Sequence, residues 1–141
     1  MSVVKRLKVV VDPNLLVSML IGKRVSEVLS IFNDKRFSVV VHAELIGEFE
    51  YVARRTKFRK YFPEHVVDAF VLKLNEECAM IQTGLKVDKI SRDPDDDYLL
   101  ALCKAAKAHV LLTGDDDMLV LEKHGRTRIM NARAFVNGYM G

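Results

Sequence analysis

Residues 7–12, Leu-Lys-Val-Val-Val-Asp, set the frame for the whole chain. The apolar, β-branched run predicts a strand that is buried on both faces, as in a parallel sheet. The following Asp12-Pro13-Asn14 predicts a turn that closes this strand. Asp12 is therefore expected at the carboxyl end of a buried strand.

Strand and helix patterns alternate along the rest of the chain. Short apolar runs predict further strands at residues 38–41, 109–113 and 127–130. Helical spacing or helix-start signals predict helices at residues 25–32 and 43–54, after Pro63, from Asp93, after Asp115 and at 132–139. This alternation predicts an α/β fold with three α/β/α layers, in which helices cover both faces of a parallel sheet of about four to five strands.

Two neighbouring segments carry signals of different strength. Residues 79–88 have weak strand character interrupted by Gly84, and they fit an extended connection or a sheet edge. The next helix has a clear start, with Asp93 as N-cap and Pro94 at the first helical position. Its buried face is expected to consist of Leu99, Leu102, Cys103 and Ala106.

Length and composition limit the possible classes of protein. The 141 residues, 50% of them hydrophobic, suffice for one core, so residues 1–141 are expected to form a single domain. The net charge of +3 fits a phosphate-bearing partner without requiring one. Cys78 and Cys103 form no CxxC pair, which favours buried free thiols over zinc or a disulfide framework. Without an apparent signal peptide or membrane span, a cytoplasmic protein is expected.

Acidic residues gather where the predicted strands end. In an open parallel sheet, ligands bind beyond the carboxyl ends of the strands. Asp12 follows the first strand, while Asp115 and Asp117 follow the strand that ends at Thr113. Asp96 and Asp97 lie in the first turn of the helix that precedes that strand. These carboxylates are expected to converge on one edge of the sheet.

Glu48 is a different kind of candidate because it lies within a helix. It borders the apolar stripe of Leu45, Phe49 and Val52, so its carboxylate is expected toward the core, where an unpaired charge is costly. A shared cation would relieve that cost. Converging carboxylates without a cysteine or histidine cluster favour one or two Mg²⁺ or Mn²⁺ ions over zinc. Such ions support the hydrolysis of phosphodiester bonds.

Each acid also has a structural explanation. The helix dipole favours acids such as Asp96, Asp97 and Asp115 in a first turn, and Asp12 also suits a turn. Glu48 could pair with a nearby basic residue, Arg55 or Lys57. The convergence of several like charges, rather than any single residue, favours a metal site. The four histidines show no pairing with the acids and are expected to be structural or exposed: His42, His65, His109 and His124.

Residues 54–62 interleave basic and aromatic side chains, which could contact phosphates and stack on the bases of single-stranded RNA. A solvated helix end explains the same stretch about as well. The RNA-binding candidates are Arg54, Arg55, Lys57, Arg59 and Lys60.

Four blocks together resemble the PIN-domain ribonucleases, in particular the VapC-like toxin components of toxin–antitoxin pairs. The blocks are Val9-Val-Val-Asp12-Pro-Asn14, Glu44-Leu-Ile-Gly-Glu48 with Arg54-Arg-Thr-Lys-Phe58, Arg92-Asp-Pro-Asp-Asp-Asp97-Tyr-Leu-Leu-Ala101, and Leu111-Leu-Thr113-Gly-Asp115-Asp-Asp117. The similarity covers nearly the whole chain. One departure is Pro13, which stands where the family has a hydroxyl residue and which lacks a backbone donor.

The resemblance implies a site, a fold and partners. The metal-binding acids would be Asp12, Glu48, Asp97 and Asp115, with Asp117 accessory and Asp96 a rival to Asp97. The supporting hydrogen-bonding groups would be Asn14 and Thr113. The resemblance also implies strand order 3-2-1-4-5, a homodimer and a small antitoxin protein that occupies the acidic groove.

The expected function is metal-dependent cleavage of single-stranded RNA by the toxin of a toxin–antitoxin pair. Two alternatives come from other classes. The first is a catalytically weak or inactive module of the same fold that binds RNA or protein through residues 54–62. The second is a phosphatase acting on small phosphoesters.

Overall fold

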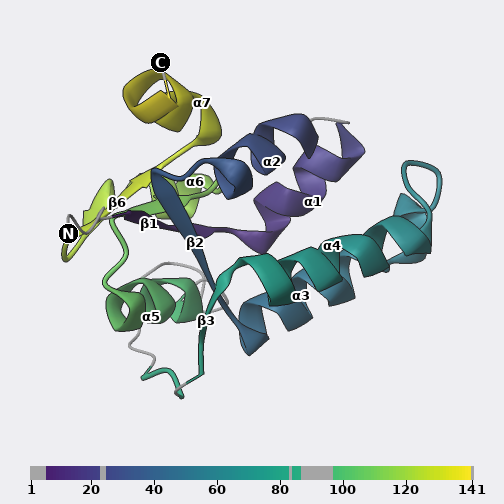
Figure 1. The fold of residues 1–141 in the computed structure, drawn as a ribbon, viewed down its shortest axis with the longest axis horizontal. Coiled ribbons are helices and arrows are strands. Elements are labelled where there is room, and N and C mark those ends of the chain that lie inside the picture. Colours follow the sequence, from purple (N-terminus) through teal and green to yellow (C-terminus); the bar gives the residue numbers. More distant parts are fainter. Residues whose placement is uncertain (1–5, 23–24, 83, 87–96, 141) are drawn as a thin grey trace.

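A computed structural model describes residues 6–22, 25–82, 84–86 and 97–140 of the chain. These residues form a six-stranded sheet in the order β3-β2-β1-β4-β6-β5 (Figure 1). All neighbouring strands are parallel except the last pair, β5 and β6. The strands are β1 (Leu7–Val11), β2 (Phe37–His42), β3 (Ala79–Ile81), β4 (Val110–Leu112), β5 (Lys123–His124) and β6 (Thr127–Met130).

Helices connect the parallel strands. They are α1 (Pro13–Ile21), α2 (Val25–Asn33), α3 (Ala43–Ala53), the short 3-10 helix η1 (Thr56–Phe58), α4 (Glu64–Glu77), α5 (Asp97–Ala106), α6 (Asp116–Leu119) and α7 (Ala132–Phe135), which continues as the π-helical turn η3 (Val136–Met140). Four strands are each followed by a helix whose N-cap side chain accepts a backbone N–H of the first turn. These caps are Asp12, His42, Asp115 and Asn131.

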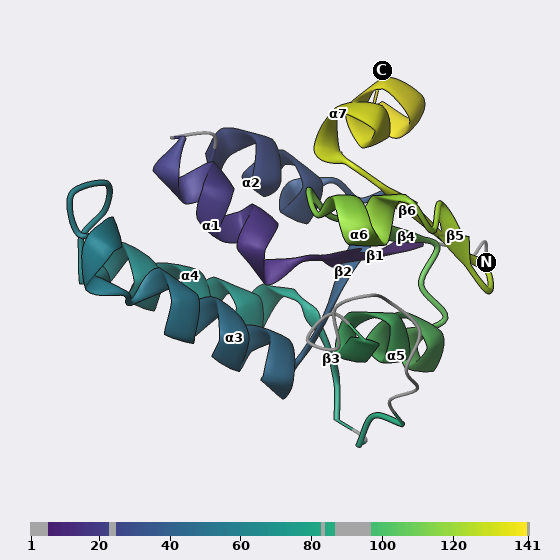
Figure 2. The same cartoon turned by 180° about the vertical axis from the view of Figure 1, so that it is seen from behind.

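The helices lie on both faces of the sheet. Leu7 is aligned with Phe37 and Lys8 with Ser38, and successive residues of a strand point to opposite faces. The Phe37 ring packs against Phe135 of α7 with 5.1 Å between centroids, whereas Lys8 Nζ donates to the Ala106 carbonyl of α5 at 3.2 Å. The helices α5 and α7 therefore cover opposite faces (Figures 1 and 2).

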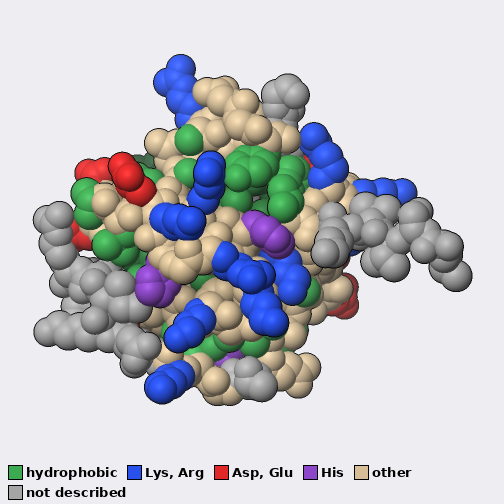
Figure 3. All heavy atoms as spheres, turned by 90° about the vertical axis from the view of Figure 1, so that its left-hand side faces the viewer, with side chains coloured by type: hydrophobic (Ala, Val, Ile, Leu, Met, Phe, Trp, Pro, Cys, Tyr) green, Lys and Arg blue, Asp and Glu red, His purple; other side chains and the backbone are tan. Residues whose placement is uncertain are grey.

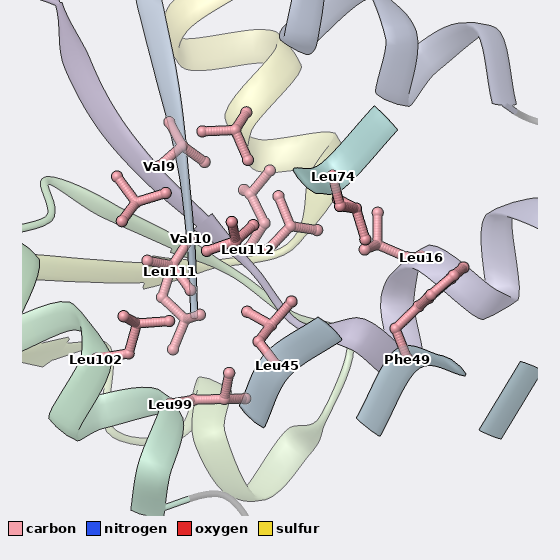
Figure 4. Close-up of a cluster of buried hydrophobic side chains, with 14 of the residues drawn as sticks. Val9, Val10, Leu16, Leu45, Phe49, Leu74, Leu99, Leu102, Leu111 and Leu112 are labelled. Atoms are coloured by element: carbon pink, nitrogen blue, oxygen red, sulfur yellow. The ribbon is translucent and has the colours of Figure 1, made fainter. Parts of the chain in front are cut away.

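The hydrophobic core joins the central strands to these helices. Val9, Val10, Leu111 and Leu112 are fully buried. Around them, Figure 4 shows side chains of the surrounding helices: Leu16 of α1, Leu45 and Phe49 of α3, Leu74 of α4, and Leu99 and Leu102 of α5. Burial on both faces explains why Val9–Val11 of β1 and Val110–Leu112 of β4 are continuous apolar runs rather than alternating ones.

The structure confirms the α/β class, the layers and the parallel order, and it adds details. Residues 79–81 form the edge strand β3, which agrees with one of the two alternatives predicted for that segment, a sheet edge. The additional strand β5 pairs with β6 in a hairpin that has a two-residue turn. Gly125, the first residue of this turn, has φ +59, a conformation that favours glycine. The two-residue length of β5 is too short for an apolar period to reveal it.

The helix α1 is the one substantial element that the sequence analysis did not predict. Asp12-Pro13-Asn14 was expected to form a turn that closes the first strand, but Asp12 is the N-cap and Pro13 is the first residue of a helix. The same three residues are also a helix-start signal, since proline is preorganised for the first helical position. The missing N–H of Pro13 is not needed there, so the departure from the family pattern is accommodated by the backbone.

Two further predictions concern burial and the helix start. Cys103 is buried and Cys78 half-buried, both as free thiols, and burial raises the pKa of each thiol to about 12. The expected start of α5 at Asp93 and Pro94 lies outside the described residues, whereas its expected buried face is confirmed. Among the described helices, none has the length and apolar character needed to span a membrane.

Candidate active site

The register between β1 and β4 brings Asp12 and Thr113 together. Val11 is aligned with Leu112, so the next residue on each strand leaves the sheet at the same edge. The Asp12 backbone N–H donates to the Leu112 carbonyl at 2.8 Å. The Thr113 hydroxyl donates to Asp12 Oδ2 at 2.8 Å, although the two residues are 101 positions apart in the sequence. Both side chains are buried.

Burial makes Asp12 an unusual carboxylate. The residue is only 2% exposed, and this burial is the main reason why the pKa of Asp12 is raised above its usual value. The Thr113 hydroxyl and the Asn14 backbone N–H, which donates to Oδ1 at 2.9 Å, act in the opposite direction. The nearby negative charge of Asp115 raises the pKa further. A cation at this position would favour the charged form.

Thr113 and Asp115 continue this hydrogen-bond network. The Thr113 hydroxyl oxygen accepts from the Asp115 backbone N–H at 3.1 Å while its proton goes to Asp12. Asp115 is half-buried, and its Oδ1 accepts from the Asp117 backbone N–H at 2.9 Å, which caps α6. One hydroxyl therefore orients two of the four acids expected to bind metal.

A cavity of about 320 Å³ opens at these side chains. Its lining contains both Asp12 and Asp115, together with the first two turns of α1, which leave the end of β1 (Figure 2). The lining residues are Asp12, Asn14, Leu15, Ser18, Gly114 and Asp115. Ser18 was not singled out from the sequence, although it is four positions after Asn14 and such residues share one side of a helix. Recognising α1 would have revealed it.

Glu48 and Asp97 come from two other helices. Glu48 is half-buried on α3, whose N-cap is the imidazole of His42. Its Oε2 accepts a hydrogen bond from the hydroxyl of Tyr98, the residue after Asp97 on α5. Asp97 itself is 3% exposed at the start of that helix. Tyr98 is a residue that the sequence analysis missed, because nothing in its local pattern indicates a partner 50 positions away.

The donor set can be tested against a divalent cation. Within the described residues, no group of three or more His, Cys, Asp or Glu side chains is placed to bind one ion, and Asp96 lies outside those residues. Asp12 and Asp115, however, line one cavity and are coupled electrostatically. Because Mg²⁺ is usually held by one or two carboxylates with waters and substrate phosphate, this pair fits it. The two carboxylate oxygens of Asp12 also have lone pairs to spare beyond the hydrogen bonds from Asn14 and Thr113.

The five basic candidates after α3 divide into two groups. Arg54 forms ion pairs with Glu50 at 3.1 Å and with Asp68 at 2.6 Å, and Arg59 donates to the Ala53 carbonyl. These two arginines tie the end of α3 to the following residues. The second group consists of three exposed residues: Arg55, Lys57 and Lys60.

Tyr51 stands out beside this segment because its ring is 72% exposed. The Arg55 guanidinium lies over the ring, 5.5 Å from its centroid. Both residues line a cavity of about 680 Å³ on the outer side of α3. Tyr51 is three positions after Glu48, so the two side chains lie on neighbouring positions of one helix surface. Its exposure could not be inferred from residue type alone.

Comparison with known protein families gives a match that includes most of this site. A family model described as a PIN domain matches residues 8–117. The matched region begins in β1, extends into α6 and contains all of the candidate metal-binding acids. No curated protein matches the chain.

Proposed function

The chain belongs to the PIN-domain family, and from this premise we propose that it is a Mg²⁺- or Mn²⁺-dependent endoribonuclease that cleaves single-stranded RNA. PIN domains are typically nucleases that use divalent metals, so nucleic acid is the substrate class. The observation that carries the proposal is the buried Asp12 carboxylate, hydrogen-bonded through both oxygens and sharing a cavity with Asp115.

Asp12 and Asp115 would hold the metal, and we assign Glu48 and Asp97 to the same catalytic group. Asp117 and Asp96 are proposed as further ligands. When bound, a divalent cation supplies Lewis-acid activation of water and of the phosphodiester. The cation would also offset the cost of keeping Asp12 charged in a buried position, a cost that its raised pKa reflects.

The protein's own contribution is orientation. The Thr113 hydroxyl and the Asn14 backbone N–H hold the two oxygens of Asp12, and the Asp117 N–H holds Asp115. Because these donors are set by strand ends and helix caps, the carboxylates need little rearrangement when a ligand arrives. Such preorganisation is worth more in a site of low exposure than in water.

RNA would reach the acids along the surface at the end of α3. The exposed Tyr51 ring offers a stacking face for a base, and Arg55, Lys57 and Lys60 can contact phosphates. Single-stranded RNA suits this surface, because unpaired bases can stack on aromatic side chains. Arg54 and Arg59 would support the surface through their intramolecular contacts rather than bind RNA.

The direct test is incubation of single-stranded RNA with the purified protein and Mg²⁺ or Mn²⁺. We expect internal cleavage that EDTA abolishes and that Asp12→Asn and Asp115→Asn each reduce by about 100-fold or more. Cleavage that persists in both variants would contradict the proposal. RNA binding without cleavage or acid-dependent metal uptake would instead favour the non-catalytic module, and hydrolysis of a chromogenic phosphate would favour the phosphatase.

The finer biological role, a toxin that acts as a homodimer and is inhibited by a small antitoxin, rests on the four sequence blocks alone. Growth arrest on expression, abolished by Asp12→Asn and relieved by the product of a short adjacent reading frame, is the expected outcome. Growth unaffected by the active protein would contradict the toxin role and leave the nuclease proposal intact.

A further inference from the structure

A second cavity, lined largely by basic residues, lies at the opposite edge of the sheet, where the strands begin. Its volume is about 330 Å³. The lining comes from the end of α5 and from the β5–β6 hairpin, and it consists of Lys104, Lys107, His124, Gly125, Arg126 and Thr127. Among the described residues, no carboxylate lines this cavity.

Further basic side chains lie next to this cavity and continue its positive charge along the surface. Lys8 lies beside the end of α5, where its Nζ donates to the Ala106 carbonyl, and its backbone N–H donates to Nδ1 of His109 at 3.0 Å. On the hairpin, Arg126 lies in the turn between His124 and Thr127, which are aligned. The basic edge is the name used below for this surface, which consists of Lys8, Lys104, Lys107 and Arg126 with His109 and His124. Figure 3 shows Lys and Arg side chains gathered with histidines across this side of the molecule.

Among the described residues, the cations of the basic edge have no ion-pair partner. In the part of the chain that the structure describes, none of its lysines or arginines forms an ion pair, whereas Arg54 elsewhere pairs with Glu50 and Asp68. The helix dipole accounts for lysines at the end of α5, and charges on an edge strand discourage strand pairing. Neither effect accounts for Arg126, which lies in the hairpin turn and lines the cavity on the side facing away from α5.

We propose that the basic edge binds backbone phosphates of an RNA strand whose reacting bond lies in the acidic site. This inference rests on the proposed function. The helix α5 links the two regions, because it starts at Asp97 and ends beside Lys107. Its length is about 15 Å at a rise of about 1.5 Å per residue. The basic edge would therefore hold the strand several nucleotides away from the cleavage point.

The chemistry of the lining favours a nucleic acid over an acidic protein. Lysine and arginine are the usual donors to phosphate, and arginine can bind it through two parallel hydrogen bonds. Protein interfaces are generally anchored by buried Trp, Tyr or Arg side chains. The described lining of this cavity contains no Trp or Tyr, and Arg126 is exposed rather than buried. Phosphates therefore match what the surface offers.

The test compares Lys104→Ala/Lys107→Asn with the unaltered protein in binding a labelled single-stranded RNA of about 16 nucleotides, across a salt series. EDTA prevents cleavage, so the result does not depend on whether the chain is a nuclease. Asparagine replaces Lys107 because this residue has φ +55, which asparagine tolerates. We expect roughly tenfold weaker binding and a salt slope shallower by about 0.7 for each phosphate that the variant no longer neutralises.

The control is Lys35→Ala/Arg133→Ala, which removes the same charge from exposed positions outside the cavity lining. It should retain nearly all of the affinity. Melting temperatures of both variants would show that they fold. An unchanged salt slope in the Lys104→Ala/Lys107→Asn variant, or an equal loss of affinity in the control, would overturn the inference.

A second arm adds polyglutamate as a competitor of the labelled RNA. If polyglutamate competes as well as RNA of equal charge, the surface binds polyanions in general, and the assignment to RNA fails.

Discussion

The two edges of the sheet carry charges of opposite sign, and these charges differ in how deeply they are buried. At the carboxyl ends of β1 and β4, Asp12 is almost fully buried and both of its oxygens accept hydrogen bonds. At the other edge, Lys104, Lys107 and Arg126 are exposed around an open cavity. Burial gives the acids a defined geometry at a cost in stability, while exposure leaves the cations adaptable and costs the fold little. Substitutions should therefore affect stability and chemistry together at the acidic edge, and binding alone at the basic edge.

The largest expected effect comes from Asp12→Asn. Cleavage should fall by about 100-fold or more, yet the melting temperature at neutral pH without metal should rise, because the variant buries no charge. The raised pKa of Asp12 means that the folded state holds this proton more tightly than the unfolded state. The Asp12 contribution to stability is therefore lost as pH rises through that pKa. Melting curves over a pH series check this.

Two comparisons sharpen this prediction. The difference in melting temperature between Asp12→Asn and the unaltered protein should disappear at pH values below the usual carboxyl pKa, and Mg²⁺ should stabilise only the unaltered protein. Asp116→Asn, at an exposed neighbour of Asp115, is the matched control and should change neither quantity. A lower melting temperature of Asp12→Asn at neutral pH would contradict the view that this charge destabilises the fold.

Thr113→Val should have the next largest effect. The side chain keeps its shape but loses the hydroxyl that donates to Asp12 and accepts from Asp115. We expect a loss of about 1–3 kcal/mol in the free energy of unfolding, because buried partners remain unsatisfied. Cleavage should fall by about 10- to 100-fold. Thr113→Ser should restore most of both, and equal activity of the valine and serine variants would refute the role of the hydroxyl.

Tyr98→Phe tests whether Glu48 is positioned by its tyrosine partner. The change removes the donor to Glu48 Oε2 and leaves the ring in place. We expect kcat for RNA cleavage to fall by about tenfold, with KM little changed and a loss of stability of about 1 kcal/mol. Tyr61→Phe, at an exposed ring, is the control. A change in KM alone would show that the hydroxyl acts on RNA binding rather than through Glu48.

The smallest effect concerns two adjacent arginines that repeat the contrast between paired and unpaired charge. Arg55→Ala removes an exposed cation from the Tyr51 ring and should weaken RNA binding by about threefold, with the melting temperature unchanged. Arg54→Ala breaks the ion pairs with Glu50 and Asp68 and should lower the melting temperature. Fluorescence binding and thermal melts separate the two, and the reverse pattern would contradict the assignment.

The sequence alone predicted the layers, the parallel sheet and the clustering of Asp12 and Asp115 near one edge. It could do so because strand period and helix period are local properties, and because parallel strands end at a common edge. It missed α1, since Asp12-Pro13-Asn14 is compatible with both a turn and a helix start. The helical spacing of Leu16, Val17 and Leu20, which are buried against the core, would have decided between them.

Only the tertiary structure decided which side chains meet. Segments far apart in the sequence meet in three places: the hydrogen bond from Thr113 to Asp12, the hydrogen bond from Tyr98 to Glu48, and the basic edge. A local pattern determines which residue leaves a strand or lies on a helix surface, but the packing of the whole chain determines its neighbours. Burial follows from the same packing, so the raised pKa of Asp12 and the exposed cations at the opposite edge could not be inferred from residue type or spacing.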